Sequence, residues 1–393
     1  MLKNVYVTGG VRTPFGSFNG SLASLTAPQL GAIAVREALR RAGVSPSDVD
    51  HVYFGNVVQA GLGQNPARQV SRGAGIPDHI GAITINKVCG SSMRAVIMAS
   101  QTIQCGDAGL IVAGGCESMT NAPYFLPGAR AGYRMGNGEL VDGLIHDGLQ
   151  DAYDGKHMGL CGDMCAAKYG FTRQEQDLYA IASYKRAIAA WDNGFFAGNV
   201  VPVEIKTRKE TTVVDRDEDL AKFREDKLPS LPPAFGKDGT VSAGNASNID
   251  DGAAAMIVVG EERMRELGLT PRARILGYAN AATAPDWFTE APVLALKALS
   301  ERLSLKLSDV DLFEINEAFA VVPMLAMKQL GLNHDKVNAY GGAVAIGHPI
   351  GATGARIINT LVAGLRARGG RIGIATLCIG GGEADAIALE RCD

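Results

Sequence analysis

A four-residue sequence that occurs twice constrains the fold of this chain more than any other feature. Ser-Asp-Val-Asp stands at 47–50 and again at 308–311, an offset of 261 residues in a chain of 393. In both places a helical pattern precedes it and an apolar run typical of a buried strand follows. Self-similarity at a fixed offset is the signature of a repeated structural unit. We therefore expect two related α/β halves.

The middle of the chain differs in texture from both halves. Residues 121–138 are rich in Pro, Gly, Tyr and Arg, residues 204–227 are rich in charge, and one amphipathic helix is expected at 174–191. This texture favours a long insertion rather than part of a sheet. The predicted domains are 1–117 together with 249–272, an inserted loop domain at 118–248, and 273–393.

The alternation of helices and strands outside the insertion also predicts how the sheets are built. Such alternation favours mostly parallel sheets with helices on both faces, and ligands at the carboxyl ends of the strands. A Gly9-Gly10 pair after the first strand invites a dinucleotide-binding interpretation. We reject it, because Pro14 and Gly16 interrupt the helix that a phosphate-binding turn requires and the G-x-G-x-x-G spacing is absent.

Composition excludes several classes of protein. Hydrophobic residues make up 47% and charged residues 20%, with a formal net charge of −3, so no basic excess points to nucleic acid or to a membrane surface. No stretch of 18 uninterrupted apolar residues predicts a membrane span, and the first residues carry no signal-peptide pattern. The seven cysteines, an odd number without a framework, fit reduced thiols. We expect a cytoplasmic protein that binds neither nucleic acid nor membrane.

Cys89 falls where a strand at 82–85 passes into an apolar helix that starts near Ser92. The free N–H groups and the dipole of a helix N-terminus stabilise negative charge, so a thiol there is biased toward thiolate. The alternative is an inert buried cysteine, which is the common case for this residue type.

Three turns in the second half strengthen the catalytic interpretation. Asn316 follows a buried strand, His348 lies in the glycine-rich turn 347–351, and Cys378 precedes Gly380-Gly381-Gly382. An imidazole can take a proton from a thiol and hold the thiolate, which is what nucleophilic catalysis needs. Backbone N–H groups in a glycine turn can approach a developing oxyanion. The four turns together predict one catalytic site.

These turns carry a resemblance to a known family. Over essentially its whole length the chain resembles the thiolases, through Val88-Cys89-Gly90-Ser91-Ser92-Met93, Asn316-Glu317-Ala318-Phe319-Ala320, the run 338–354 around Gly347-His348-Pro349, and Leu377-Cys378-Ile379-Gly380-Gly381-Gly382. The resemblance implies an α/β fold of two duplicated halves, layered α-β-α-β-α, with an inserted loop domain. It also implies the acetyl-CoA C-acetyltransferase reaction, which condenses two acetyl-CoA molecules reversibly to acetoacetyl-CoA and CoA.

The resemblance further implies a role for each residue. Cys89 is the acyl-accepting nucleophile, His348 activates it, and Cys378 moves the α-proton of the second thioester. Asn316 holds a water that, with His348, polarises one carbonyl, while the N–H groups of Cys89 and Gly380 serve the other oxyanion. The implied coenzyme A contacts are Leu149, His157, Met158, Ala234, Phe235, Ala243, Ser247 and Phe319. Coenzyme A thioesters are substrates and no cofactor or metal is implied; the segment 118–138 implies a homotetramer, a dimer of dimers.

Two departures from the family pattern concern the substrate. The segment Asp219-Leu220-Ala221-Lys222-Phe223-Arg224 is shortened where relatives place an arginine near the nucleotide phosphates, which leaves Lys222 and Arg224 as candidates. Phe288-Thr289-Glu290-Ala291-Pro292 replaces a glycine-rich stretch at the pocket floor. The bulky Met158 and Phe235 favour short acyl chains.

Four other interpretations remain open. A degradative 3-ketoacyl-CoA thiolase of broader chain length would use the same residues. A thiolase-like acyl-lipid-binding protein would not need both Cys89 and His348, and a β-ketoacyl synthase would have a second histidine in place of Asn316. His157, Cys161 and Cys165 share one helical face and would suit a metal, but no fourth ligand is evident.

Overall fold

The computed structural model describes residues 3–206 and 208–393. Its main sheet is 10-stranded, in the order β12-β13-β14-β11-β1-β10-β5-β3-β4, with β2 paired to β10. The strands of this sheet are β1 (Val5–Arg12), β2 (Gly16–Ser17), β3 (His51–Gly55), β4 (Gly81–Ile85), β5 (Leu110–Ser118), β10 (Asp250–Gly260), β11 (Ala273–Ala282), β12 (Leu312–Ile315), β13 (Ile372–Ile379) and β14 (Glu383–Arg391).

The α-helices outside the insertion are distributed over both halves. They are α1 (Ala27–Ala42), α2 (Pro66–Gly73), α3 (Ser91–Cys105), α6 (Glu261–Glu266), α7 (Ala291–Leu303), α8 (Val321–Leu330), α9 (Ala343–Ile346) and α10 (Thr353–Arg368). Among the described residues, no helix is long and apolar enough to cross a membrane.

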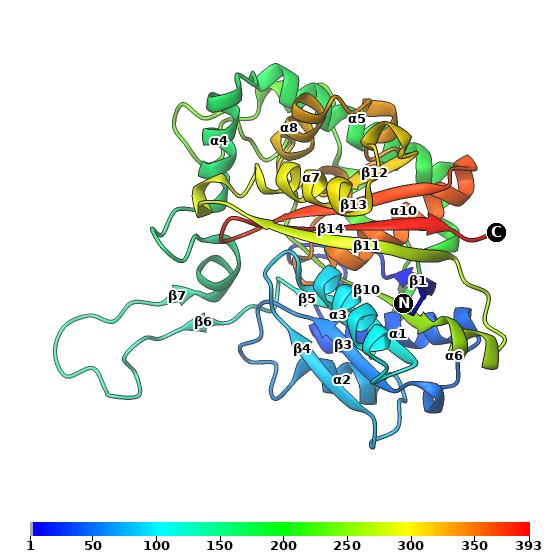
Figure 1. Ribbon diagram of the computed structural model, residues 1–393. Helices are drawn as coiled ribbons and strands as arrows, with labels where there is room; N and C mark the ends of the chain where they lie inside the picture. The colour runs from blue at the N-terminus through cyan, green and yellow to red at the C-terminus, as the bar shows by residue number, and fades with distance from the viewer. Residues whose placement is uncertain (1–2, 207) are drawn as a thin grey trace.

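The helices divide the molecule into five layers. Helix α1 packs on β1, β5 and β10, while α7 packs on β11, β13 and β14. Between them, α3 and α10 contact each other and lie against strands of both halves, as Figure 1 shows for α3 below β11 and above β3. Buried apolar side chains of α3 and α10, including Val96, Ile97, Ile357 and Ile358, form the central core. The predicted α-β-α-β-α architecture of two related halves is confirmed.

The prediction of mostly parallel sheets is wrong. Only the pairs β3–β4, β3–β5 and β12–β13 are parallel in the main sheet, and its other pairs are antiparallel. A parallel pair needs a crossover of a dozen or more residues, whereas β13 and β14 are joined by the turn Gly380–Gly382. The halves are also continuous, because Tyr6 and Val7 of β1 pair with Arg274 and Ala273 of β11.

The last aspartate of the repeated Ser-Asp-Val-Asp makes equivalent hydrogen bonds in both halves. The carboxylate of Asp50 accepts the N–H groups of Gly109 and Leu110, at 2.7 and 2.9 Å. The carboxylate of Asp311 accepts those of Arg371 and Ile372 at the same two distances. Each aspartate therefore accepts hydrogen bonds from two backbone N–H groups at the start of a central strand, β5 in one half and β13 in the other.

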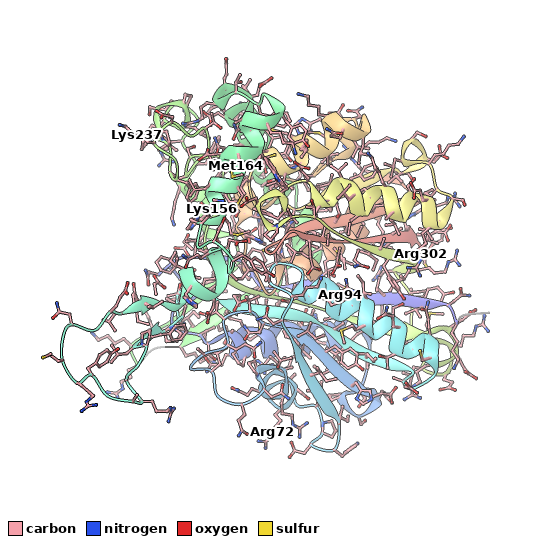
Figure 2. The ribbon with its side chains drawn as sticks, turned by 60° about the vertical axis from the view of Figure 1, so that its left-hand side comes forward. Arg72, Arg94, Lys156, Met164, Lys237 and Arg302 are labelled. Atoms are coloured by element: carbon pink, nitrogen blue, oxygen red, sulfur yellow. The ribbon has the colours of Figure 1, made fainter. Side chains whose placement is uncertain are left out.

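An ion pair on the central layer ties the halves together. The guanidinium of Arg94 on α3 bonds both carboxylate oxygens of Asp385 on β14, and Asp385 is fully buried. Figure 2 shows Arg94 at the level where the two halves meet.

The segment predicted to be an insertion leaves the sheet after β5 and returns at β10, and Ser118 pairs with Asp251 there. It contains α4 (Met158–Tyr169), α5 (Arg173–Asp192), the hairpin β6 (Tyr124–Phe125) with β7 (Val141–Asp142), and the hairpin β8 (Val203–Lys206) with β9 (Thr211–Val214). The loop between β6 and β7 extends away from the body of the molecule (Figure 1).

Candidate active site

Cys89 lies in a tight turn between β4 and α3 that several hydrogen bonds fix. Val88 has φ of 45°, a left-handed conformation that is rare and strained for a β-branched residue. The Ser91 hydroxyl accepts the Lys87 N–H at 2.9 Å and donates to the Val88 carbonyl at 2.6 Å. The Asn86 side chain accepts the Val88 N–H at 3.0 Å. This network of hydrogen bonds holds Val88 in its strained conformation and so fixes the position of Cys89.

Burial opposes the bias toward thiolate that the helix N-terminus is expected to give Cys89. Desolvation raises the pKa of its thiol to about 11, although the N–H groups of Gly380 and of Cys89 itself act to lower the pKa. The residue keeps some exposed surface, yet the loss of water around sulfur outweighs the helix N-terminus. Cys89 therefore needs a base to become a nucleophile near neutral pH.

His348 is a buried imidazole with a defined tautomer. Its Nδ1 lies 2.7 Å from the Thr353 hydroxyl, and that hydroxyl donates to the Pro349 carbonyl at 2.9 Å. The Thr353 oxygen must then accept, so Nδ1 carries the proton and Nε2 keeps its lone pair. Burial first, and the charge of Arg356 second, lower the pKa of His348 to about 3. The ring is thus neutral, with a free acceptor nitrogen 3.4 Å from Asn316 Nδ2.

The N-terminal ends of α3 and α10 approach each other closely enough to bring these turns together. The Ala355 N–H at the start of α10 donates to the Ser92 hydroxyl at 2.9 Å. A Cβ on Gly354 would lie 2.5 Å from the Met93 nitrogen, and one on Gly115 would overlap the Gly351 carbonyl oxygen. Only glycine fits at these crossings, which explains why the catalytic turns are glycine-rich.

The second thiol and the glycine turn reach the same place from β13. Cys378 is buried, and desolvation together with the nearby Cys89 raises the pKa of its thiol well above the usual value. Next to it, Ile379 lies so close to Gly90 that a Cβ there would overlap its side chain. The Gly380 N–H faces the Cys89 sulfur. Cys378 and Gly380 therefore lie beside Cys89, and Asn316 lies beside His348.

A cavity of about 380 Å³ leads to this cluster. All eight residues predicted to contact coenzyme A line it, namely Leu149, His157, Met158, Ala234, Phe235, Ala243, Ser247 and Phe319. His348 lines it as well, whereas Cys89, Cys378, Asn316 and Gly380 do not appear in its walls. Cys89 packs beside Met119 and Ile350, which are wall residues, so the nucleophile adjoins the cavity.

Aromatic stacking shapes one wall. His157 and Phe235 stack with ring centroids 4.6 Å apart, and Phe235 meets Phe319 edge-on at 6.1 Å. His157 Nδ1 also accepts the Gly159 N–H and so caps α4. This explains His157 without a metal, and within residues 3–206 and 208–393 no group of three His, Cys, Asp or Glu side chains is placed to hold a metal ion.

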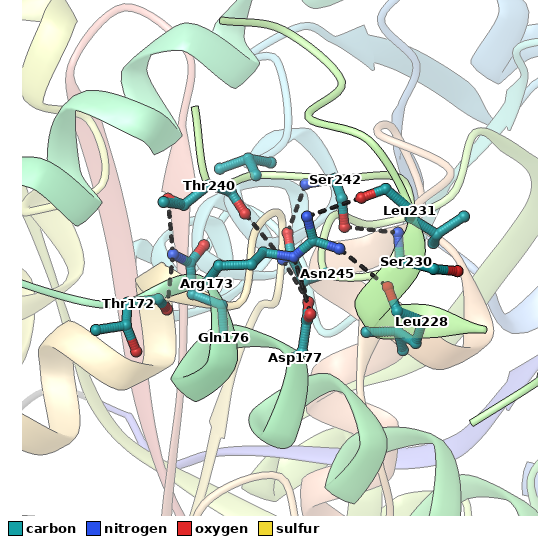
Figure 3. Close-up of polar contacts among 12 residues, drawn as sticks. Thr172, Arg173, Gln176, Asp177, Leu228, Ser230, Leu231, Thr240, Ser242 and Asn245 are labelled. Carbon is teal, nitrogen blue, oxygen red and sulfur yellow. Dashed lines mark hydrogen bonds and ion pairs between the residues drawn. The ribbon is translucent and has the colours of Figure 1, made fainter. Parts of the chain in front are cut away.

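A buried polar network supports the opposite wall (Figure 3). Asp177 on α5 accepts from the Asn245 amide at 2.9 Å and pairs with Arg173 at 2.8 Å. Arg173 in turn donates to the carbonyl oxygens of Leu228 and Leu231, at 2.9 Å each. The network holds the segment 240–247, which carries Ala243 and Ser247, against α5.

Three residues of the site escaped the sequence analysis. Thr353 orients His348, and Arg356 lies 3.3 Å from Asn316 Oδ1. Glu117 is the last but one residue of β5; its carboxylate accepts from the Asn56 amide and from the Val57 N–H, and burial raises its pKa to about 7. In the sequence, Glu117 and Arg356 each stand out as a single charged residue in an otherwise apolar stretch, and that pattern could have identified them.

A larger cavity, of about 540 Å³, lies elsewhere and contains none of the candidate residues. Gly9, Gly10, Asn359 and Arg366 are among its lining residues. Gly9 and Gly10 lie inside β1, at a register shift against β10, rather than at a strand-to-helix turn. The cavity beside His348 is therefore the candidate active site, because the predicted substrate contacts and His348 line it.

Comparison with known proteins agrees with this geometry. The model of the thiolase N-terminal domain matches residues 5–262, and that of the thiolase C-terminal domain matches residues 269–391. The chain is 52% identical over 391 residues to acetyl-CoA acetyltransferase 1 of Arabidopsis thaliana, covering 99% of this chain and 94% of that protein. It is 48% identical over 391 residues to the cytosolic acetyl-CoA acetyltransferase ERG10 of Gibberella zeae, covering 99% and 98%.

Solved structures show the same relationship. The Acat5 thiolase of Ascaris suum in complex with coenzyme A superposes with a TM-score of 0.94 at 45% identity, covering 99% of this chain and 100% of that one. The acetyl-CoA acetyltransferase of Bacillus anthracis superposes with a TM-score of 0.97 at 40% identity, covering 100% and 99%. Sequence, fold and site geometry lead to one conclusion: this chain belongs to the thiolase family.

Proposed function

We propose that the protein is an acetyl-CoA C-acetyltransferase that condenses two acetyl-CoA molecules reversibly to acetoacetyl-CoA and CoA. The observation that carries the proposal is that Cys89, with Cys378 and the Gly380 N–H beside it, adjoins a cavity whose wall contains the neutral imidazole of His348. The printed names of the relatives, which are acetyl-CoA acetyltransferases, support the substrate.

In the first half-reaction the His348 Nε2 lone pair takes the Cys89 proton. The thiolate attacks the thioester carbonyl, the bond to the CoA sulfur breaks, and the CoA thiolate leaves with the proton from the imidazolium. The N–H groups of Cys89 and Gly380, which face the Cys89 sulfur, are placed to bind the oxyanion of the tetrahedral intermediate.

In the second half-reaction Cys378 first loses its own proton to water, and its thiolate then takes the α-proton of a new acetyl-CoA. The resulting carbanion attacks the acetyl group on Cys89, a carbon–carbon bond forms, and the bond to the Cys89 sulfur breaks. Asn316 Nδ2 and His348 Nε2, 3.4 Å apart, would hold the water that polarises the second thioester carbonyl. Because burial makes the Cys378 thiol a weak acid, its thiolate is a strong base toward the α-proton. The departing Cys89 thiolate takes up a proton from water, which completes the cycle.

The cavity suits the pantetheine arm, and a second cavity suits the nucleotide. The second, of about 290 Å³, shares Asp219, Lys222, Ala243 and Asn248 with the first. Its other lining residues include Arg224 and Lys227, so three cations surround it. We assign the nucleotide phosphates of coenzyme A to this cationic cavity, and propose that no metal or organic cofactor takes part.

We propose a short acyl specificity and keep the degradative 3-ketoacyl-CoA thiolase as the second candidate. Met158 and Phe235 occupy the cavity as large apolar side chains. Steady-state thiolysis of acetoacetyl-CoA, compared with 3-ketohexanoyl-CoA and longer 3-ketoacyl-CoA, tests both. Equal kcat/KM for short and long substrates would reject the short-chain assignment, and no turnover with any of them would reject the thiolase activity.

We also propose a homotetramer, a dimer of dimers, in the cytoplasm. The loop between β6 and β7 exposes large apolar side chains that a monomer leaves in water: Leu126 (48%), Tyr133 (46%), Met135 (99%) and Leu140 (67%). Exposed apolar groups gathered on one protruding segment indicate an interaction site. The name of the Gibberella zeae relative, cytosolic, supports the location. Light scattering that finds a stable, active 41.2 kDa monomer would reject the tetramer.

A further inference from the structure

A buried arginine lies directly behind the candidate catalytic amide. Arg356, on the first turn of α10, is 1% exposed. Its Nη2 lies 3.3 Å from Asn316 Oδ1, and its Nη1 lies 3.7 Å from a carboxylate oxygen of Glu314. Glu314 is also 1% exposed and lies in β12, and Asn316 is the first residue after that strand. The guanidinium therefore sits between the carboxyl group of Glu314 and the amide.

This arrangement is poorly suited to stabilising the fold. Within the described part of the chain, both carboxylate oxygens of Glu314 and the Nε of Arg356 lack hydrogen-bond partners. A buried ion pair repays its desolvation only with good geometry and further hydrogen bonds, and apolar replacements are often neutral or stabilising. The pair at 3.7 Å meets neither condition, so its place is better explained by what the charge does at the site.

The arginine decides which way the Asn316 amide faces. A guanidinium only donates, so the atom that faces Arg356 must be the carbonyl oxygen Oδ1. The Nδ2 group is then turned to His348 Nε2, 3.4 Å away. Nε2 can accept there because Thr353 holds the proton on Nδ1. With the amide reversed, Asn316 Oδ1 would face His348 Nε2, which is also an acceptor, and Asn316 Nδ2 would face the N–H donors of Arg356.

The same cation acts on the imidazole through space. Besides burial, the positive charge of Arg356 lowers the pKa of His348. The charged groups around the arginine itself are Glu314, Arg12, Glu317 and Asp217, and Arg186 reaches Glu314. Since burial alone also lowers the pKa of His348, removing Arg356 should return only part of the shift.

We propose that Arg356 is a positioning residue, which locks the Asn316 amide with its N–H group toward His348 and the reacting carbonyl. The charge of Arg356 also disfavours a proton on His348. The proposal rests on the proposed function, since it assigns Asn316 and His348 to the second half-reaction. Arg356 acts through them and touches no reacting atom.

A double-mutant cycle between Arg356 and Asn316 tests this. We expect Arg356→Met to slow condensation about 30-fold or more, and to slow acetylation of Cys89, followed by intact mass, far less. In an Asn316→Ala background the same change should cost less than about threefold, because the amide that it positions is gone. Arg366→Met, an exposed arginine on the same helix, is the control and should leave both rates unchanged.

Two further measurements keep the test decisive. Arg356→Lys keeps the charge without the planar fork, so it should fold even where the methionine variant does not, and should lose condensation by an intermediate factor. Histidine-selective ¹⁵N NMR should show the His348 ring titrating at a higher pH in Arg356→Met than in wild type, and Arg356→Lys, which keeps the charge, should shift it less. This readout needs no turnover, so a wild type without condensation activity would refute the proposed function but leave the Arg356 test standing. Fully multiplicative losses in the cycle, or an unchanged His348 titration, would overturn the proposal.

Discussion

The Thr353 hydroxyl lies 2.7 Å from His348 Nδ1 and donates its own proton to the Pro349 carbonyl oxygen. This pair decides the tautomer of the imidazole and leaves Nε2 free as an acceptor. A free Nε2 is what a buried thiol with a pKa of about 11 requires of its base.

Replacing Thr353 should therefore slow the chemistry more than it weakens binding. Thr353→Val leaves the buried Nδ1–H without an acceptor, at a cost of about 1–3 kcal/mol, which equals roughly 5- to 150-fold in rate. We expect that loss in the rate of Cys89 acetylation, with little change in KM. Thr353→Ser keeps the hydroxyl and should retain near wild-type rates in the same stopped-flow assay; equal losses in both variants would contradict the tautomer argument.

The two thiols should have separable tasks. Cys89→Ala should abolish both half-reactions, since no acyl-enzyme can form. Cys378→Ala should still accept an acetyl group on Cys89, visible by intact mass, while carbon–carbon bond formation falls by about 10²–10⁴-fold, the usual contribution of a positioned acid/base. A Cys378→Ala variant that condenses at the wild-type rate, or one that is never acetylated, would refute these roles.

Met158 should limit the acyl chain. A Cβ on Gly380 would lie 3.5 Å from the Met158 methyl group, which places that side chain at the thioester end of the cavity. Met158→Ala should raise kcat/KM for 3-ketohexanoyl-CoA relative to acetoacetyl-CoA by about tenfold, as expected for a few methylene groups. Met164→Ala, on the same helix but outside the cavity (Figure 2), should leave that ratio unchanged. An unaltered ratio in Met158→Ala would show that the chain limit lies elsewhere.

Lys222 and Lys227 should matter only for substrates that carry the nucleotide. Lys222 lines both cavities and pairs with Asp219 at 2.8 Å, while Lys227 lines the second. Lys222→Ala and Lys227→Ala should each raise KM for acetyl-CoA about threefold to tenfold, the range for partly exposed charge contacts. KM for acetyl-pantetheine should not change, and Lys237→Ala, an exposed lysine away from both cavities (Figure 2), is the control. A rise with both substrates would mean that the lysines shape the pantetheine site instead.

Acid should destabilise the fold through His348. Burial lowers its pKa from 6.5 to about 3, so the unfolded chain binds the proton first. Its contribution to stability is complete above pH 6.5 and is lost as pH falls toward 3, by up to about 1.4 kcal/mol per pH unit. Urea unfolding between about pH 5 and pH 6.5 should therefore slope less steeply in His348→Gln than in wild type, whereas a change at the exposed His79 should have no such effect. Glu117 and Glu314, whose pKa values are raised to about 7 and 8, act in the opposite direction, losing stability as pH rises through those values. Parallel slopes in the two proteins would contradict the burial argument for His348.

Much of the site could be predicted from the sequence alone. The repeat predicted two related halves because Asp50 and Asp311 meet the same need, two unpaired N–H groups at the start of a central strand. Cys89, Asn316, His348 and Cys378 were identifiable because glycine-rich turns after apolar strands are local patterns. The eight cavity residues came from motif resemblance, and all of them line one cavity.

The direction of the strands, the acidity of Cys89 and the role of Arg356 were decided by tertiary structure alone. Antiparallel pairing depends on which strands meet across the sheet, as β1 and β11 do although they lie far apart in the sequence. The helix N-terminus at Cys89 is local and favours thiolate, but desolvation comes from residues far away in sequence and exceeds it. In the sequence, Arg356 is only one charge in an amphipathic helix. The packing of α10 on β12 places it beside Asn316. Local interactions depend on neighbouring residues and can be predicted from the sequence, whereas burial and long-range contacts form only when the whole chain has folded.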